Sequence, residues 1–261
     1  MNCLIETALL THGLRSIANE ELAQSWHCPD AILAWVDRGE LKLGPIGEYL
    51  PFRERSEELV RIDCDHLEEA RQSRASGALT ASGTMAVCRR LDIPMAITCG
   101  MGGIGDLRGE ELCPDLPALM NIPVALISTS PKDMLDRPAT LDWLRRHGVH
   151  TAGEPCTGYL FCGEPVALEL PLSSCNNEAA VRRLTANGGL LLLNPIPEKE
   201  RVQDRSILVD AIKAGKQAEA EGHYYHPAAN GEIDRRTGGY SSRIQLESIQ
   251  QNYLLAKSIM D

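Results

Sequence analysis

Ile93-Pro-Met-Ala-Ile-Thr-Cys99 is a continuous apolar run in the middle of the chain, and a glycine-rich segment follows it directly. Two later runs have the same character, Ile122-Pro-Val-Ala-Leu-Ile127 and Leu190-Leu-Leu-Leu-Leu-Asn194. Short apolar runs without polar alternation are typical of strands that are buried on both faces of a sheet. The three runs therefore predict central strands of a covered sheet.

Segments with helical periodicity lie between and after these runs, at 81–91, 140–147, 177–185, 206–221 and 242–260. Buried strands that alternate with helices predict an α/β fold, a three-layer α/β/α sandwich with a mixed, mostly parallel sheet. The chain has 261 residues and no linker-like tract, so we expect one domain over 1–261. Ligand sites in such folds gather beyond the carboxyl ends of the strands, and the residues there are the candidates for function.

The composition excludes several kinds of partner. The formal net charge is −10, which argues against binding to nucleic acid or to an anionic membrane. No apolar run approaches the roughly 20 residues that a membrane span needs. The nine cysteines include no Cys-x-x-Cys pair, so we expect reduced thiols in a cytoplasmic protein.

The glycine-rich segment is Gly100-Met-Gly-Gly-Ile-Gly105, and its spacing matches G-x-G-x-x-G. A polar stretch follows it in place of an apolar helix, which argues against a dinucleotide site. One interpretation is a turn that needs positive φ angles. We favour a backbone cradle in which Gly102 and Gly103 approach an anion or a sugar.

Two ionisable residues are the candidates for catalysis. Lys132 follows the second apolar run, after a Ser-Pro pair that predicts a helix start. A solvated lysine is the ordinary interpretation, but a lysine with a lowered pKa forms imines with carbonyl compounds. Glu6 lies inside the first apolar run, Cys3 to Leu10, where a carboxylate is costly unless it is paired or functional. An edge-strand glutamate that faces water is the alternative.

The third apolar run ends in Asn194-Pro-Ile-Pro-Glu198. Two prolines at this spacing fix an extended, rigid turn. The turn either terminates the strand or forms a platform that directs its asparagine and glutamate into a cleft.

Two clusters suggest metal binding. Glu111 and Asp115 have i, i+4 spacing and could hold a hard cation from one helix face, although an exposed acidic face is the more usual case. His223 and His226 lack a third ligand nearby, so we expect them to be loop residues.

Taken together, these features resemble the pseudouridine-5′-phosphate glycosidase family, which includes the indigoidine-synthase-A-like proteins. The resemblance covers almost the whole chain, in the family's order, and Asn-Pro-Ile-Pro-Glu is its most specific segment. The matching stretches are 5–13, 76–85, 100–104, 132–136, 187–198, 218–222 and 239–246.

The resemblance implies reversible cleavage of the C–C bond between uracil and ribose 5-phosphate. A C-glycoside has no heteroatom leaving group, and the family instead holds C1′ of the opened sugar as an imine on a lysine, which Lys132 matches. Glu6 matches the family's acid. The family uses Mn²⁺ near an Asp-x-x-x-Asp stretch, which Glu111 and Asp115 match in spacing, and it forms homotrimers.

The chain also departs from the family at positions that bind the substrate or its phosphate. The family's lysine aligns with Ala75, and its His-Arg-Gly becomes Leu107-Arg-Gly109. Arginine recognises phosphate in a bidentate manner, so Arg74, Arg108 and Arg243 are the candidates to rebuild a phosphate site.

Three functions follow from the sequence. The first is a C-glycosidase that acts on a uracil-like base and ribose 5-phosphate. The second is a C-nucleoside synthase of specialised metabolism, and the third is a non-catalytic relative that binds a sugar phosphate. Retention of both Glu6 and Lys132 argues against the third.

Overall fold

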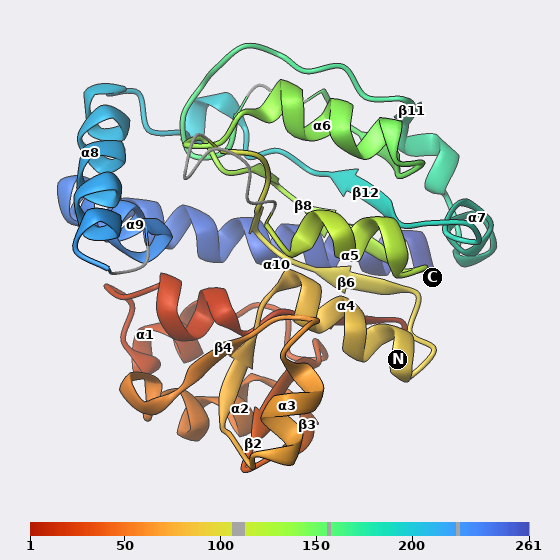
Figure 1. The fold of residues 1–261 in the computed structure, drawn as a ribbon, viewed down its shortest axis with the longest axis horizontal. Helices are drawn as coiled ribbons and strands as arrows, with labels where there is room; N and C mark the ends of the chain where they lie inside the picture. Colours follow the sequence, from red (N-terminus) through yellow and green to blue (C-terminus); the bar gives the residue numbers. More distant parts are fainter. Residues whose placement is uncertain (106–112, 156–157, 223–224, 261) are drawn as a thin grey trace.

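The computed structural model describes residues 1–105, 113–155, 158–222 and 225–260 (Figure 1). Ten strands within these residues form one sheet. In order across the sheet they are β11 (Leu170–Pro171), β10 (His150–Gly153), β12 (Leu190–Leu193), β8 (Ala125–Ser128), β6 (Met95–Ile97), β1 (Cys3–Ile5), β2 (Leu33–Asp37), β5 (Gly77–Leu79) and β4 (Val60–Ile62), and β3 (Glu40–Gly44) pairs with β2.

Most neighbouring strands are parallel, and the exceptions are at one end of the sheet. Strands β11 to β2 run in one direction. Strand β2 is antiparallel to both β3 and β5, and β4 is parallel to β5. The prediction of a mixed, mostly parallel sheet is confirmed.

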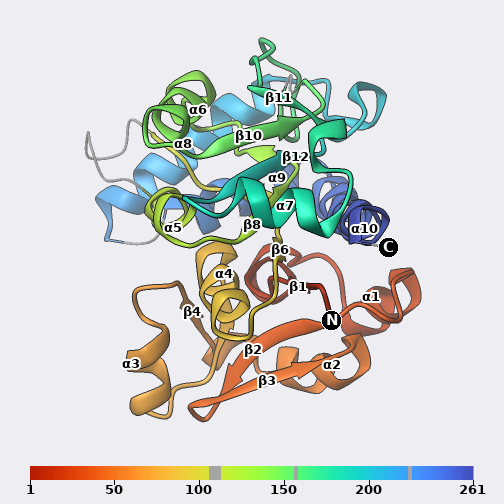
Figure 2. The ribbon, with the colours of Figure 1, turned by 90° about the vertical axis from the view of Figure 1, so that its right-hand side faces the viewer.

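Helices cover both faces of this sheet. Figure 2 shows α3 to α6 on one side of the strands and α1, α2 and α10 on the other. The helices are α1 (Asn19–Ser25), α2 (Ile46–Arg53), α3 (Leu67–Gln72), α4 (Ala81–Arg90), α5 (Asp115–Asn121), α6 (Arg137–Arg146), α7 (Glu178–Leu184), α8 (Ser206–Ala220), α9 (Tyr225–Arg236) and α10 (Tyr240–Met260). None of the described helices has the length and apolarity that a bilayer-spanning helix requires.

The apolar side chains divide between two cores, one on each face of the sheet. In β12, Leu190 and Leu192 belong to the core under α10, whereas Leu191 and Leu193 belong to the core under α4 and α5. Successive strand residues point to opposite faces, so a strand that is apolar at every position must be covered twice. Apolar side chains on both faces of the central strands therefore require a layer of helices on each face, which gives the three-layer sandwich.

Polar segments follow the carboxyl ends of the parallel strands. Beyond β6 and β8 the chain forms a second, two-stranded sheet of β7 (Gly100–Met101) and β9 (Ser130–Pro131). Strand β5 approaches the end of β1 from the opposite direction, and the backbone N–H of Thr7 donates to the Leu79 carbonyl at 3.2 Å. The carboxyl ends of β1 and β5 therefore meet, at the point where the strand direction reverses.

Candidate active site

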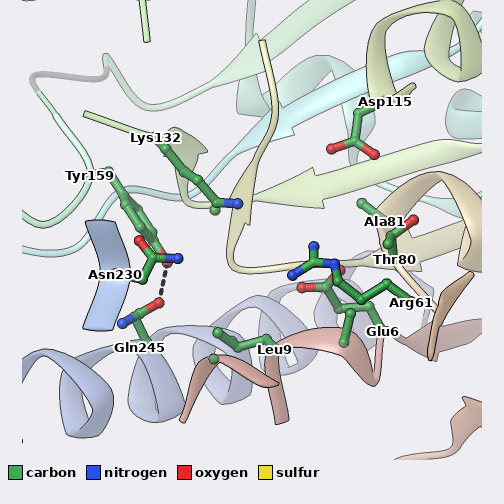
Figure 3. Close-up of a pocket in the computed structure, with 13 residues that line it drawn as sticks. Glu6, Leu9, Arg61, Thr80, Ala81, Asp115, Lys132, Tyr159, Asn230 and Gln245 are labelled. Atoms are coloured by element: carbon green, nitrogen blue, oxygen red, sulfur yellow. Dashed lines mark hydrogen bonds between the residues drawn. The ribbon is translucent and has the colours of Figure 1, made fainter. Parts of the chain in front are cut away.

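A pocket of about 460 Å³, including its open mouth, lies at this meeting point. Its walls come from segments that are far apart in the sequence (Figure 3). The lining residues are Glu6, Ala8, Leu9, Gly13, Arg61, Thr80, Ala81, Gly100, Asp115, Lys132, Tyr159, Asn230 and Gln245. The structure thus brings together Glu6, Lys132 and Asp115, which the sequence singled out.

Lys132 enters the pocket from the end of β9, where its backbone N–H donates to the Met101 carbonyl at 3.2 Å. Burial lowers the pKa of its ammonium, and the positive charge of Arg61 lowers it further. Cys113, Asp115 and Glu6 act in the opposite direction. A lysine with a lowered pKa has a larger fraction of neutral amine, which is the nucleophilic form.

The local structure around Lys132 differs from the prediction. Ser130 and Pro131 form strand β9 and do not start a helix. The helix begins at Arg137, where the Asp136 carboxylate caps it by accepting from the Ala139 N–H at 2.9 Å. The Ser-Pro pair was misread because the second small sheet pairs these residues with the glycine-rich segment.

Glu6 is the first residue after β1, and only 6 % of its surface is exposed. Its backbone N–H donates to the Ile97 carbonyl at 2.9 Å, which fixes it beside the end of β6. Burial raises the pKa of its carboxyl to about 7, and the charge of Asp115 adds to this effect, whereas Lys132 and Arg61 oppose it. Glu6 can therefore both give and accept a proton near neutral pH.

Asp115 is the first residue of α5 and is almost fully buried. Its Oδ1 accepts from the Ser82 N–H at 3.1 Å, and its Oδ2 accepts from the Gly102 N–H at 2.8 Å. The glycine cradle is therefore occupied by a carboxylate of the chain itself. Asp115 ties the glycine-rich segment to the start of α4 across the pocket.

Gly102 and Gly103 are required for close packing. A Cβ on Gly102 would lie 2.0 Å from Sγ of Cys113, and one on Gly103 would lie 2.5 Å from Oγ1 of Thr140. Neither glycine lines the pocket, whereas Gly100 does. The Gly102 N–H donates to Asp115, and the expectation that these two glycines approach the substrate stays a prediction.

The described residues do not by themselves complete a metal site. Within the described ranges, no three His, Cys, Asp or Glu side chains converge as metal ligands would. Asp115 is placed to offer one carboxylate, although both of its oxygens already accept N–H groups. Glu111, its predicted partner, lies outside the described residues, as does Arg108.

The other predicted substrate-binding residues are not part of the pocket wall. Arg74 is exposed at the amino end of β5, whereas the pocket lies at the carboxyl end of that strand. Arg243 pairs with Glu21 at 3.1 Å and joins α10 to α1. Asn194 donates through Nδ2 to the Asn252 side chain at 2.9 Å, so it ties the end of β12 to α10.

Arg61 on β4 is the arginine that the structure does bring to the pocket among its described lining residues. It was missed because β4 is a short edge strand whose sequence, Val60-Arg-Ile62, carries no motif. Thr80 was within a recognised stretch, and its Oγ1 caps α4 by accepting from the Gly83 N–H at 3.3 Å. A threonine directly before an expected helix is an N-cap signal that could have marked this turn.

Tyr159, Asn230 and Gln245 were also missed, because they come from a loop and two late helices. The Tyr159 hydroxyl donates to Oε1 of Gln245 at 2.9 Å. The prediction for His226 was wrong, since this residue is on α9 and not in a loop. Burial lowers the pKa of His226 to about 3, and the charges of Lys132 and Arg61 lower it further.

These features define an α/β enzyme with a buried lysine and a buried carboxyl group at the carboxyl edge of its sheet. Residues 4–260 match the model of the indigoidine synthase A like proteins, and the chain belongs to this family. It is an enzyme similar to pseudouridine-5′-phosphate glycosidases, as the curated relatives show.

The pseudouridine-5′-phosphate glycosidase of Methylobacterium nodulans is 28 % identical over 98 % of this chain and 81 % of its own length. That of Saccharopolyspora erythraea is 29 % identical over 98 % of this chain and 90 % of its own length.

Two solved structures share the fold. An indigoidine synthase A-like protein of Thermotoga maritima has a TM-score of 0.81 at 20 % identity, over 98 % of this chain and 91 % of its own. The prealnumycin C-glycosynthase AlnA, in complex with ribulose 5-phosphate, has a TM-score of 0.78 at 21 % identity over the same shares.

Proposed function

We propose that this enzyme makes and breaks the C–C bond between ribose 5-phosphate and a uracil-like base, through an imine of the opened sugar on Lys132. The observation that carries the proposal is one pocket that holds a lysine of lowered pKa beside a glutamate with a pKa of about 7. The names of the curated relatives support the substrate class.

Lys132 supplies the electron sink. Its neutral amine adds to the C1 aldehyde of the open-chain sugar, and loss of water gives an iminium ion. In synthesis the base carbon forms a bond to the iminium carbon while the C=N electrons move onto the nitrogen, and the 4-hydroxyl of the sugar then displaces the Lys132 amine and closes the ring. Cleavage runs through the same steps in reverse. Arg61 and Glu6 line the same pocket as the lysine.

Glu6 handles the proton at the base. The ionised carboxylate takes the proton from the base carbon when the C–C bond forms, and the carboxylic acid returns it when the bond breaks. A pKa of about 7 leaves both forms populated near neutral pH. Glu6 can therefore serve either direction, and synthesis is the second candidate because AlnA, which has the same fold, is a C-glycosynthase.

Arg61 is the cation that we assign to the sugar phosphate. A guanidinium forms two charge-assisted hydrogen bonds with a phosphate, and Arg61 lines the pocket whereas Arg74 and Arg243 do not. A divalent ion such as Mn²⁺ and a homotrimer remain predictions. Chelation that lowers turnover reversibly would support the metal, and light scattering would give the oligomeric state.

The decisive experiment is trapping with borohydride. Ribose 5-phosphate plus borohydride should add the mass of the reduced sugar to the peptide that contains Lys132. Pseudouridine 5′-phosphate should release free uracil in the same preparation. Turnover without any adduct at saturating sugar would rule out the imine. The absence of both the adduct and free uracil would rule out the proposed function.

A further inference from the structure

Two polar side chains on one face of α9 have unused hydrogen-bonding capacity, one in the pocket wall and one a turn away from it. Asn230 lines the pocket, and its carboxamide forms no hydrogen bond within the described part of the chain. His226 precedes it by four residues and therefore lies on the same helix face. Its Nδ1 is buried and has no hydrogen-bond partner among the described residues. Buried polar atoms without partners are rare in folded proteins, so the His226 imidazole points to a ligand, and Asn230 offers its carboxamide to the same ligand from the pocket wall.

The orientation of α9 is fixed by contacts beyond the pocket. Asp234, a further turn along the same face, accepts through Oδ1 from the hydroxyls of Ser16, Ser241 and Ser242 at 3.1, 3.2 and 2.7 Å. These bonds join α9 to the segment after the Leu9–Gly13 turn and to the start of α10. Asn230 and His226 are therefore presented by a helix that is already held in place.

The pocket has a charged side and an uncharged side (Figure 3). Glu6, Arg61 and Asp115 gather on one side, and Tyr159, Asn230 and Gln245 gather on the other, with Lys132 reaching between them. Gln245 is already occupied, since its Oε1 accepts from Tyr159 and its Nε2 donates to the Ser241 carbonyl at 3.0 Å. It holds the tyrosine, while Asn230 stays free for a ligand.

The chemistry of the uncharged side suits a neutral ring. The low pKa of the His226 imidazole keeps this side chain neutral at physiological pH, so it offers one N–H donor and one lone pair. The Asn230 carboxamide likewise both donates and accepts. A carbonyl next to an N–H would satisfy both residues, and the Tyr159 ring supplies a flat apolar surface for the rest of such a ring.

We infer that Asn230 and His226 select the base that is joined to the sugar, as an uncharged planar ring with a carbonyl next to an N–H group. This inference rests on the proposed function. It places the phosphate toward Arg61 and the carbonyl and N–H edge of the base toward α9 and Tyr159, while the reacting carbon of the base faces Lys132 and Glu6. The two residues act on specificity, and they do not take part in forming the imine.

The test uses the full-length protein, ribose 5-phosphate, borohydride and uracil as the probe of the base. Uracil that adds to the imine lowers the yield of the reduced adduct. The uracil concentration that halves this yield therefore measures the apparent affinity of the pocket for the base. In Asn230→Leu and His226→Phe, this concentration should rise about fivefold to tenfold or more. The ribose 5-phosphate concentration that gives half-maximal adduct should change less than about twofold, because it measures the affinity for the sugar phosphate, which these two residues do not contact in the proposal.

Asn187→Leu is the matched control, because Asn187 is exposed in the turn after α7 and should leave both concentrations unchanged. Adduct formation by each variant shows that the pocket is folded. Equal shifts for uracil and sugar, or no shift for uracil, would overturn the inference, as would a wild-type enzyme that forms the adduct but does not respond to uracil. A wild-type enzyme without any adduct would instead refute the proposed imine chemistry.

Discussion

The two sides of the pocket differ in how the fold delivers their residues. Glu6 and Arg61 extend from strands of one sheet, and Lys132 directly follows the small strand β9. Tyr159 comes from a loop, and Asn230 and Gln245 come from two helices near the end of the chain. Strands therefore hold the groups that we propose for the reaction and the phosphate, whereas a loop and two helices hold the groups that we propose for the base. Variants on the two sides should therefore fail in different ways.

Lys132→Ala should have the largest effect of any substitution on the charged side. We expect turnover to fall at least about a thousandfold and the borohydride adduct to vanish, because no other group supplies the electron sink. Mass spectrometry of the trapped protein measures this directly. Lys199→Ala removes a lysine whose side chain is 82 % exposed, and it should leave the adduct intact. An adduct in Lys132→Ala would move the imine to another lysine.

Glu6→Gln should slow turnover by about a hundredfold or more while adduct formation persists, because the amide cannot move the proton. In the wild type, cleavage should decline as the pH rises through about 7 and the acid form is lost. Synthesis should decline as the pH falls through the same value. Initial rates in both directions test this, with the exposed Glu40→Gln as control. Near wild-type rates would make Glu6 a structural carboxyl group.

Arg61→Ala should raise KM for a phosphorylated substrate by about tenfold to a hundredfold, the range for a lost charge-assisted hydrogen bond. An unphosphorylated analogue should bind almost as well as it does to the wild type. Arg74→Ala and Arg243→Ala should have no such effect, since neither residue lines the pocket. Equal effects of Arg61→Ala on both substrates would place the phosphate elsewhere.

Glu6 should also affect stability, because a buried carboxylate in a reaction pocket costs free energy. Its pKa is raised from 4.5 to about 7 on folding, so the folded state binds the proton more tightly than the unfolded state. Stability should therefore fall as the pH rises from about 4.5 to about 7. Glu6→Gln should be more stable than the wild type at pH 8, by about 1 to 3 kcal/mol in urea unfolding. A less stable variant would contradict this.

Asp133→Asn should have the smallest effect, on the uncharged side. The Asp133 carboxylate accepts from the backbone N–H groups of Tyr159, Leu160 and Phe161 at 2.8, 2.7 and 3.0 Å. Weakening these bonds should loosen Tyr159 and raise the half-effective uracil concentration a few-fold, with little change for ribose 5-phosphate. Asp92→Asn, whose side chain is 92 % exposed, is the control. A matching loss of sugar affinity would show that Asp133 supports the whole pocket.

The sequence by itself predicted the layered sheet, and it singled out Glu6 and Lys132, which the structure brings into one pocket. Continuous apolar runs such as 190–194 can only be buried on two faces, and Glu6 stands out because a carboxylate inside such a run is costly without a role. Lys132 was singled out by the family resemblance. The predicted helix start before Lys132 was wrong, because Ser130 pairs with Gly100 in a small sheet, and this contact joins segments that are distant in the sequence.

Only the tertiary structure decided which neutral and cationic groups complete the pocket. Arg61 and Asn230 carry no local signal, and their roles depend on an edge strand and a late helix meeting the end of β1. Arg74 and Asn194 have side chains that could bind a substrate. Arg74, however, lies at the amino end of β5, away from the pocket, and the Asn194 side chain donates a hydrogen bond to Asn252 on α10. Position relative to a strand end is set by long-range pairing, which spacing along the chain does not encode.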